Sequence, residues 1–213
     1  MNQPETPDIP QVLKHTSWLL TRHIIRRLAL SLALMALPPV LFSLGAPNTF
    51  FLALPIPVGM WLLLFLALRL RHGWRLNVCK KVLHTYPLEH RTRVVRKHGD
   101  GTGTEWKYLG TIHTIKLSSR GSHGAPRMRA VNATTMRRWP EGADDGGAWF
   151  AGDPIFGGVM IVPGAKDMMF MQPANWQKYA QARAQAEPAR IERAQRAGIA
   201  ELVERDPIVG GWV

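Results

Sequence analysis

The sequence predicts an α+β membrane protein: a two-helix transmembrane hairpin, then a small antiparallel β-sheet or barrel domain, then C-terminal helices. Three observations predict this fold. Two apolar runs without a charged residue, Leu28–Leu44 and Phe50–Leu68, are joined by the short segment Gly45–Thr49. Short segments rich in β-branched and aromatic residues follow, bounded by Gly, Pro and Asp. After Trp176 the apolar residues recur at helical spacing.

Each apolar run is close to the length that crosses a bilayer. At about 1.5 Å per residue the runs cover roughly 26–29 Å, against a hydrocarbon core of about 30 Å. The turn between them is uncharged, whereas basic residues flank both: Lys14, Arg22, Arg26 and Arg27 before the first run, and Arg69, Arg71, Arg75, Lys80 and Lys81 after the second. The positive-inside rule therefore predicts that both termini lie in the cytoplasm.

Two other interpretations of the hairpin have less support. A buried helical pair in a soluble protein would not explain the basic flanks. Arg26 and Arg27 before an apolar run are also typical of a twin-arginine signal peptide, but Ile25 precedes the pair where Ser or Thr is usual. The outward halves of both runs contain prolines, and without an intramembrane charge they indicate a bend rather than an ion path.

The positive charge is concentrated near the predicted membrane surface. The chain of 213 residues has a net charge of +12 and a pI near 10.7. Residues 1–86 hold nine Lys and Arg against Glu5 and Asp8, a net +7. Membrane topology and attraction to an anionic inner leaflet are the preferred explanation of this basic charge. Binding of nucleic acid is the second explanation. Cys79 is the single cysteine, so an intramolecular disulfide is excluded.

Four segments are expected along the chain. Residues 1–10 form a disordered start. Residues 11–85 hold an interfacial helix, the hairpin (28–44 and 50–68) and a cytoplasmic stalk that ends before Pro87. Residues 86–176 form the β-rich cytoplasmic domain, with strands expected at 91–96, 106–117, 127–133, 148–151, 158–162 and 168–171. Residues 177–213 form C-terminal helices, capped by Asn175, interrupted by Pro188 and continuing to about Glu204.

No catalytic, cofactor or metal site is predicted. Gly99–Gly103 lacks the residues of a phosphate-binding loop and is typical of a hairpin turn. Asp144, Asp145 and Asp153 favour solvated turns over a cation site, and the histidines have no zinc spacing. The candidate contacts for lipid or nucleic acid are instead basic: Arg69, Arg71, Arg75, Lys80, Lys81, Arg91, Arg93 and Arg96.

A family resemblance agrees with this outline. The segment Ala151–Gly164, closed by Gln172–Trp176, resembles uncharacterised actinobacterial integral membrane proteins with two helices and a compact C-terminal cytoplasmic domain. The resemblance implies the fold arrangement and a bacterial plasma membrane. It implies no activity and no functional residues.

We therefore expect a non-enzymatic bacterial plasma-membrane protein. Its hairpin would anchor a cytoplasmic β-rich domain that binds a protein partner or the anionic inner leaflet. One alternative is a membrane-tethered nucleic-acid-binding protein in DNA transfer or regulation. Another is a small transporter or channel subunit that forms a homo-oligomer through the hairpin.

Overall fold

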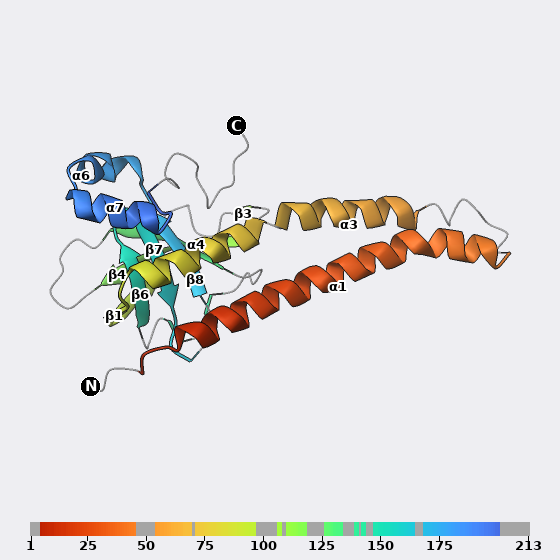
Figure 1. The fold of residues 1–213 in the computed structure, drawn as a ribbon, viewed down its shortest axis with the longest axis horizontal. Coiled ribbons are helices and arrows are strands. Elements are labelled where there is room, and N and C mark those ends of the chain that lie inside the picture. Colours follow the sequence, from red (N-terminus) through yellow and green to blue (C-terminus); the bar gives the residue numbers. More distant parts are fainter. Residues whose placement is uncertain are drawn as a thin grey trace. The chain divides into compact units, whose positions relative to one another are not determined.

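The computed structural model describes residues 5–45, 54–69, 71–96, 106–107, 110–118, 126–133, 139–140, 142–143, 147–164 and 168–200. The chain divides into two compact units (Figure 1). Ser17–Trp74 forms the hairpin unit, and Met1–Thr16 together with Arg75–Val213 forms the barrel unit. Each unit is described by itself.

One long helix and a shorter apolar one make up the hairpin unit. α1 (Ile9–Ser43) is long and apolar enough to cross a membrane, and it is the one such helix among the described residues. α3 (Pro55–Arg69) is apolar but shorter. The start of the expected second span, from Phe50, lies outside the described residues. The structure therefore shows one candidate span and leaves the second as a prediction.

The two hairpin helices approach closely at one point. Within this unit α1 and α3 lie side by side (Figure 1), and the Ser31 hydroxyl donates a 2.6 Å hydrogen bond to the Gly59 carbonyl oxygen. A Cβ at Gly59 would lie 2.6 Å from Met35 Cγ and 3.0 Å from the Ser31 carbonyl oxygen. The glycine is therefore what lets the two backbones come this close.

The barrel unit contains one antiparallel sheet. Its strands run in the order β1-β6-β7-β8-β5-β4-β2, and β3 pairs with β4. Their bounds are β1 (Glu89–Arg91), β2 (Arg93–Arg96), β3 (Trp106–Lys107), β4 (Gly110–Ser118), β5 (Arg127–Asn132), β6 (Ala148–Asp153), β7 (Gly157–Ile161) and β8 (Met168–Pro173). The edge strands β1 and β2 are separated in sequence only by Thr92, so the sheet must curl until its edges nearly meet. The expected small antiparallel sheet or barrel is thus confirmed.

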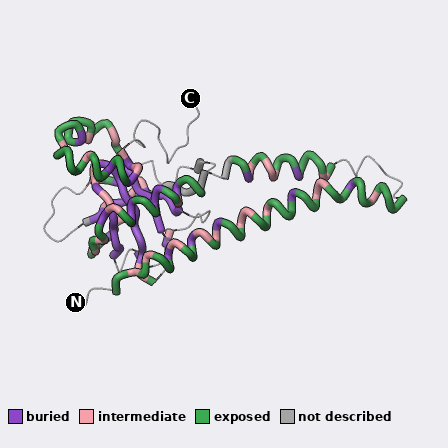
Figure 2. The backbone as a smooth tube through the Cα atoms, in the orientation of Figure 1, coloured by how far each residue is buried: buried purple, intermediate pink, exposed green. Residues whose placement is uncertain are grey.

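Both faces of this sheet are buried (Figure 2). Phe150 and Met160 belong to a hydrophobic cluster on the inner face of the curled sheet. Their neighbours Ala151 and Val159 belong to a second cluster, on the outer face, which also contains helix residues. The outer face is covered by helix residues: Val12 of α1, Val78, Cys79, Val82 and Leu83 of α4 (Arg71–Thr85), and Ala194 of α7 (Pro188–Arg196). A sheet packed on both faces has no polar side, which explains why β7 and β8 are buried along their whole length.

The packing of α4 and the start of α1 differ from what the sequence predicts. α4 ends at Thr85, as the following Pro87 predicts, but it is not a free stalk because Val82 and Cys79 have no exposed surface. α1 begins at Ile9, within the expected disordered start. The Asp8 carboxylate accepts a 3.3 Å hydrogen bond from the Gln11 N–H, which caps the helix.

The C-terminal helices are shorter than expected. Asn175 caps a 3₁₀ turn, η1 (Gln177–Tyr179), through a 3.1 Å bond from the Lys178 N–H, and α6 (Ala180–Ala184) follows. α7 starts at Pro188 but ends at Arg196 rather than near 204. Gly198 has φ +69°, a left-handed conformation that terminates the helix, and Ile199 then folds back into the core. Residues 201–213 lie outside the described part.

Candidate functional site: a pocket between Tyr86 and the Asp153–Arg190 pair

The site begins with a tight turn between β6 and β7. The Asp153 carbonyl oxygen accepts a 3.1 Å bond from the Phe156 N–H, and its carboxylate accepts a 3.0 Å bond from the Ile155 N–H. Gly152 has φ +138°, and a Cβ there would lie 2.4 Å from the Gly157 carbonyl oxygen. These glycines and the Asp side chain therefore fix where the Asp153 carboxylate lies.

A helix from the C-terminal segment supplies the cation that faces this carboxylate. Glu187 adopts ψ 136°, and Pro188 begins α7, as proline favours at a first helical position. Arg190 then reaches back across 37 positions: its Nε donates to Asp153 Oδ2, and its Nη2 donates to Oδ1 at 2.8 Å. Asp153 is 7% exposed and Arg190 is 44% exposed. The hydrogen bond to Asp153 is the largest cause that raises the pKa of Arg190.

A second arginine attaches the same turn to the segment before α7. Arg183 donates to the Ile155 carbonyl oxygen at 3.2 Å and to the Trp176 carbonyl oxygen at 2.9 Å. Its guanidinium carbon lies 3.1 Å from the centroid of the Trp176 ring. Burial lowers the pKa of Arg183 to about 10, so the side chain is still charged at neutral pH. The β6–β7 turn is thus held from two sides.

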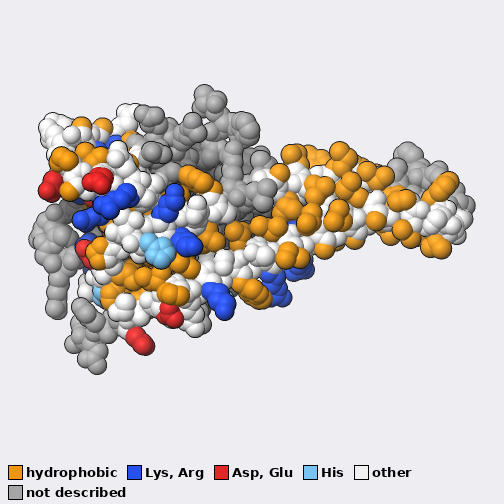
Figure 3. Space-filling view, in the orientation of Figure 1, with side chains coloured by type: hydrophobic (Ala, Val, Ile, Leu, Met, Phe, Trp, Pro, Cys, Tyr) orange, Lys and Arg blue, Asp and Glu red, His pale blue; other side chains and the backbone are white. Residues whose placement is uncertain are grey.

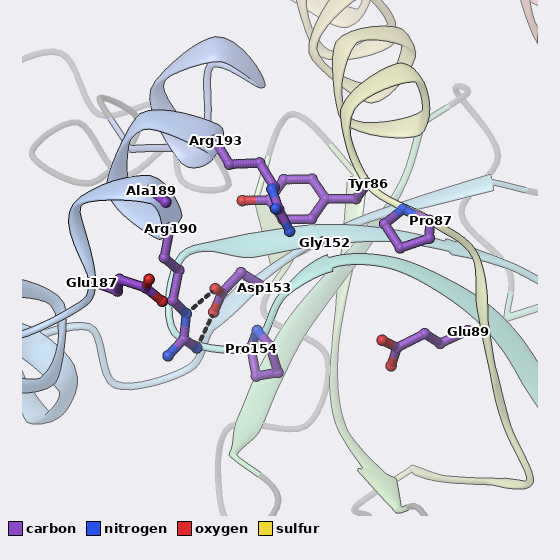
Figure 4. A pocket seen from close by; sticks show the side chains of 10 residues that line it. All are labelled: Tyr86, Pro87, Glu89, Gly152, Asp153, Pro154, Glu187, Ala189, Arg190 and Arg193. Atoms are coloured by element: carbon purple, nitrogen blue, oxygen red, sulfur yellow. Dashed lines mark hydrogen bonds and ion pairs between the residues drawn. The ribbon is translucent and has the colours of Figure 1, made fainter.

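A pocket of about 260 Å³ lies between these elements (Figure 4). It is lined from four parts of the barrel unit: Tyr86 and Pro87 after α4, Glu89 of β1, Gly152–Pro154 of the β6–β7 hairpin, and Glu187, Ala189, Arg190 and Arg193 of the α7 region. In Figure 4 the Tyr86 ring extends from the end of α4 towards α7, and the Arg193 side chain lies across it. The Arg193 guanidinium carbon is 5.9 Å from the ring centroid.

The Tyr86 hydroxyl is a buried polar group without a hydrogen-bond partner among the described residues. The residue is only 7% exposed. Burial is the main cause that raises its pKa to about 12, and the Asp153 charge adds to the increase, whereas Arg193 and Arg190 lower it. The phenol therefore keeps its proton at neutral pH and is an unused hydrogen-bond donor on a residue that lines the pocket.

The arrangement offers binding groups rather than a metal cage. Within the described ranges, no group of three or more His, Cys, Asp or Glu side chains could hold a metal ion. Asp153, one of the three aspartates weighed as a cation ligand, has both carboxylate oxygens engaged by Arg190. Asp144 and Asp145, like the turn Gly99–Gly103, lie outside the described residues.

The basic residues predicted to meet lipid or nucleic acid differ in exposure, among those whose side chains the structure describes. Lys80 and Lys81 on α4 and Arg93 on β2 are exposed. Arg75 is only 2% exposed. The side chains of Arg69 and Arg71 lie outside the described part.

The two remaining arginines of that set already make contacts within the barrel unit. Arg91 is partly buried and donates a 2.6 Å bond to Glu89, with its guanidinium carbon 5.8 Å from the Phe150 ring centroid. Arg96 is partly buried and lies 5.7 Å from the Trp139 ring centroid. Sequence spacing gave no sign of these contacts.

The pocket itself was missed by sequence reasoning. The sequence predicts only a helix end at Tyr86 and Pro87 and only a turn at Asp153. Arg190 and Arg193 stand three apart after Pro188, a spacing that places both on one helix face, and this is the one signal that could have indicated a shared site.

Comparison with known proteins adds no assignment: no protein-family model, curated protein or solved structure matches this chain.

Proposed function

We propose that this chain is a non-enzymatic bacterial plasma-membrane protein. Its two-helix hairpin crosses the membrane twice, both termini lie in the cytoplasm, and the hairpin anchors the barrel unit at the inner surface. The barrel unit binds a protein partner there.

The observation that carries this proposal is where the apolar surface lies. The exposed large hydrophobic side chains of the described residues all fall between Trp18 and Trp74. Figure 3 shows hydrophobic side chains covering the helices of the hairpin unit. Soluble monomers rarely expose an apolar surface of this extent, whereas lipid tails would cover it. The barrel unit has no large exposed hydrophobic side chain within its described residues.

The second span is supported by helix contact and by sequence. α3 has 15 residues, which cover roughly 22 Å, and the apolar run continues before it to Phe50 in the sequence. The buried bond from Ser31 to Gly59 is the kind of small-residue contact that packs helices in lipid. Trp18 and Trp74 are 54% and 46% exposed at the two basic flanks, a position that suits the headgroup region.

A protein partner is favoured over the lipid leaflet by the placement of the arginines. Arg75 is buried, and Arg91 is held by Glu89, so neither is free to meet a headgroup. Of the eight basic residues predicted to contact lipid or nucleic acid, the structure describes Lys80, Lys81 and Arg93 as exposed. These few charges give a weak membrane affinity beside that of the hairpin itself.

Topology can be tested by thiol labelling in bacterial cells. Cys79 has no exposed surface, and burial raises its pKa to about 12, so the native chain should give no background labelling. A membrane-impermeant maleimide should label Leu44→Cys in intact cells and Lys178→Cys only after permeabilisation. Labelling of Lys178→Cys in intact cells would refute the proposed orientation.

The partner can be tested by crosslinking. The full chain is crosslinked in native membranes, purified by affinity and analysed by mass spectrometry. A protein recovered with the native chain, and lost when exposed residues of the barrel unit are reversed in charge, supports the proposal. Recovery of phospholipid or nucleic acid alone would instead support one of the alternatives.

A further inference from the structure

The pocket beside α7 is lined by a hydrogen-bond donor that has no acceptor among the described residues. Tyr86 is more than nine-tenths buried, lines the pocket, and its hydroxyl has no partner among the described residues. Buried polar groups in folded proteins are nearly always paired, because an unpaired one loses its hydrogen bonds to water without compensation. An unpaired phenol at a pocket wall therefore points to a ligand that supplies the acceptor.

A cation lies next to this donor. Arg193 lines the same pocket, and Figure 4 shows its side chain alongside the Tyr86 ring. Among the described residues its guanidinium takes part in no ion pair or hydrogen bond. It therefore has its N–H groups available for an anion.

Three acidic side chains line the pocket, and two of them, Asp153 and Glu89, form ion pairs with arginines. Asp153 accepts hydrogen bonds from Nε and Nη2 of Arg190, and Glu89 is paired with Arg91 at 2.6 Å. Glu187 is exposed at the rim. Arg91, Arg190 and Arg193 balance Asp153, Glu89 and Glu187 in charge, and Arg193 is the cation among these three that pairs with no carboxylate within the described residues. A dianion would be repelled by the three nearby carboxylates.

We propose that this pocket binds a carboxylate group, which accepts hydrogen bonds from the Tyr86 hydroxyl and the Arg193 guanidinium. Two or three donors match the two oxygens of a carboxylate, and a volume of about 260 Å³ admits a small molecule or the end of a peptide. This site is distinct from membrane anchoring and does not depend on the topology of the hairpin.

The test uses the full chain in detergent and ligand-observed nuclear magnetic resonance with propionate as the probe. We expect saturation transfer to propionate, with a dissociation constant on the order of 1 mM, and none to the neutral isostere propionamide. Arg193→Gln should weaken binding at least tenfold, and Tyr86→Phe by about threefold to tenfold. The matched control is Arg196→Gln, an exposed arginine on the same helix, which should leave binding unchanged.

Tyr86→Phe also separates binding from folding. Because the hydroxyl is buried and has no partner among the described residues, its removal should not lower the urea midpoint of the barrel unit, while propionate binding falls. Equal binding of propionamide, preference for inorganic phosphate, or full binding in Arg193→Gln would each overturn the proposal.

A second arm distinguishes the two sources of a carboxylate. The affinity of propionate is compared with that of an acetylated dipeptide that ends in a free carboxylate and with that of the same dipeptide amidated. At least tenfold tighter binding of the free acid than of propionate would assign a chain terminus, and equal affinity a small carboxylate. Binding of the amidated dipeptide as tight as that of the free acid would refute a carboxylate site.

Discussion

Removal of Arg190 alone should destabilise the barrel unit more than removal of Arg190 together with the charge on Asp153. Arg190→Ala leaves a carboxylate that is 7% exposed and that, among the described residues, keeps only the 3.0 Å bond from the Ile155 N–H. The double variant Asp153→Asn/Arg190→Ala keeps that bond, because the amide oxygen still accepts it, but leaves no buried charge. The order of the two stabilities follows from the burial of Asp153.

The size of the effect can be worked from the exposure of the two partners. Breaking a fully buried ion pair costs about 3–5 kcal/mol. Arg190 is 44% exposed, so water reaches one side of this pair, and we reduce the figure by about half. Arg190→Ala should thus cost about 1.5–2.5 kcal/mol, and the double variant about 0.5–1 kcal/mol.

Urea unfolding of the full chain in detergent, followed by tryptophan fluorescence, measures both values. With a slope of about 2 kcal/mol per molar urea, Arg190→Ala should lower the midpoint by roughly 1 M. Arg196→Ala is the control, because Arg196 is 65% exposed and lies 3.9 Å from Glu192, and it should change stability by less than about 0.5 kcal/mol. If the double variant is no more stable than Arg190→Ala, the reasoning is wrong.

Three further predictions concern other parts of the fold. Ser31→Ala should weaken the hairpin by about 0.5–1.5 kcal/mol in a sodium dodecyl sulfate titration, and an unchanged midpoint would argue against the bond to Gly59. Gly152→Ala should cost about 3 kcal/mol or more in urea, because φ is +138° and the new Cβ meets backbone at 2.4 Å. Gly164→Ala, with φ +76° and open space, should cost only about 1 kcal/mol, and equal costs would contradict this account. Burial raises the pKa of Cys79 from 9.0 to about 12, so the unfolded thiol ionises first as pH rises through this window. Stability should then fall by up to about 1.4 kcal/mol per pH unit, and Cys79→Ala should reduce that slope in urea titrations at a series of pH values.

Local sequence signals predicted most of the strands, but they did not predict β1 as a separate strand and joined β3 and β4 into one strand over 106–117. Segments such as 127–133 and 168–171 are bounded by glycine, proline or aspartate, and the structure places β5 and β8 there. Their order in the sheet was not predictable, because β5 pairs with β8 across an intervening β6–β7 hairpin. Pairing of this kind depends on long-range packing, which one sequence does not reveal.

The candidate site was less predictable for the same reason. Asp153 and Arg190 form their ion pair across 37 positions, and no spacing rule links them. The many basic residues of α4 also led to a wrong prediction of its exposure. Lys80 and Lys81 suggested a solvated stalk, whereas Cys79 and Val82 on the same helix have no exposed surface. The early end of α7 depends on the left-handed conformation of Gly198.

The hydrophobic cluster on the outer face of the sheet contains residues that precede the hairpin in the sequence and residues that follow it. Val12 precedes the hairpin in the chain, and Val78 and Val82 follow it, yet all three pack in one cluster. In a free chain, closing the loop between Val12 and Val78 would cost roughly 3–4 kcal/mol of entropy. If the hairpin crosses the membrane twice as proposed, its insertion during synthesis would bring these two segments back to the same side of the bilayer and remove much of that cost. Under the proposed topology, membrane insertion would therefore precede and assist the folding of the barrel unit.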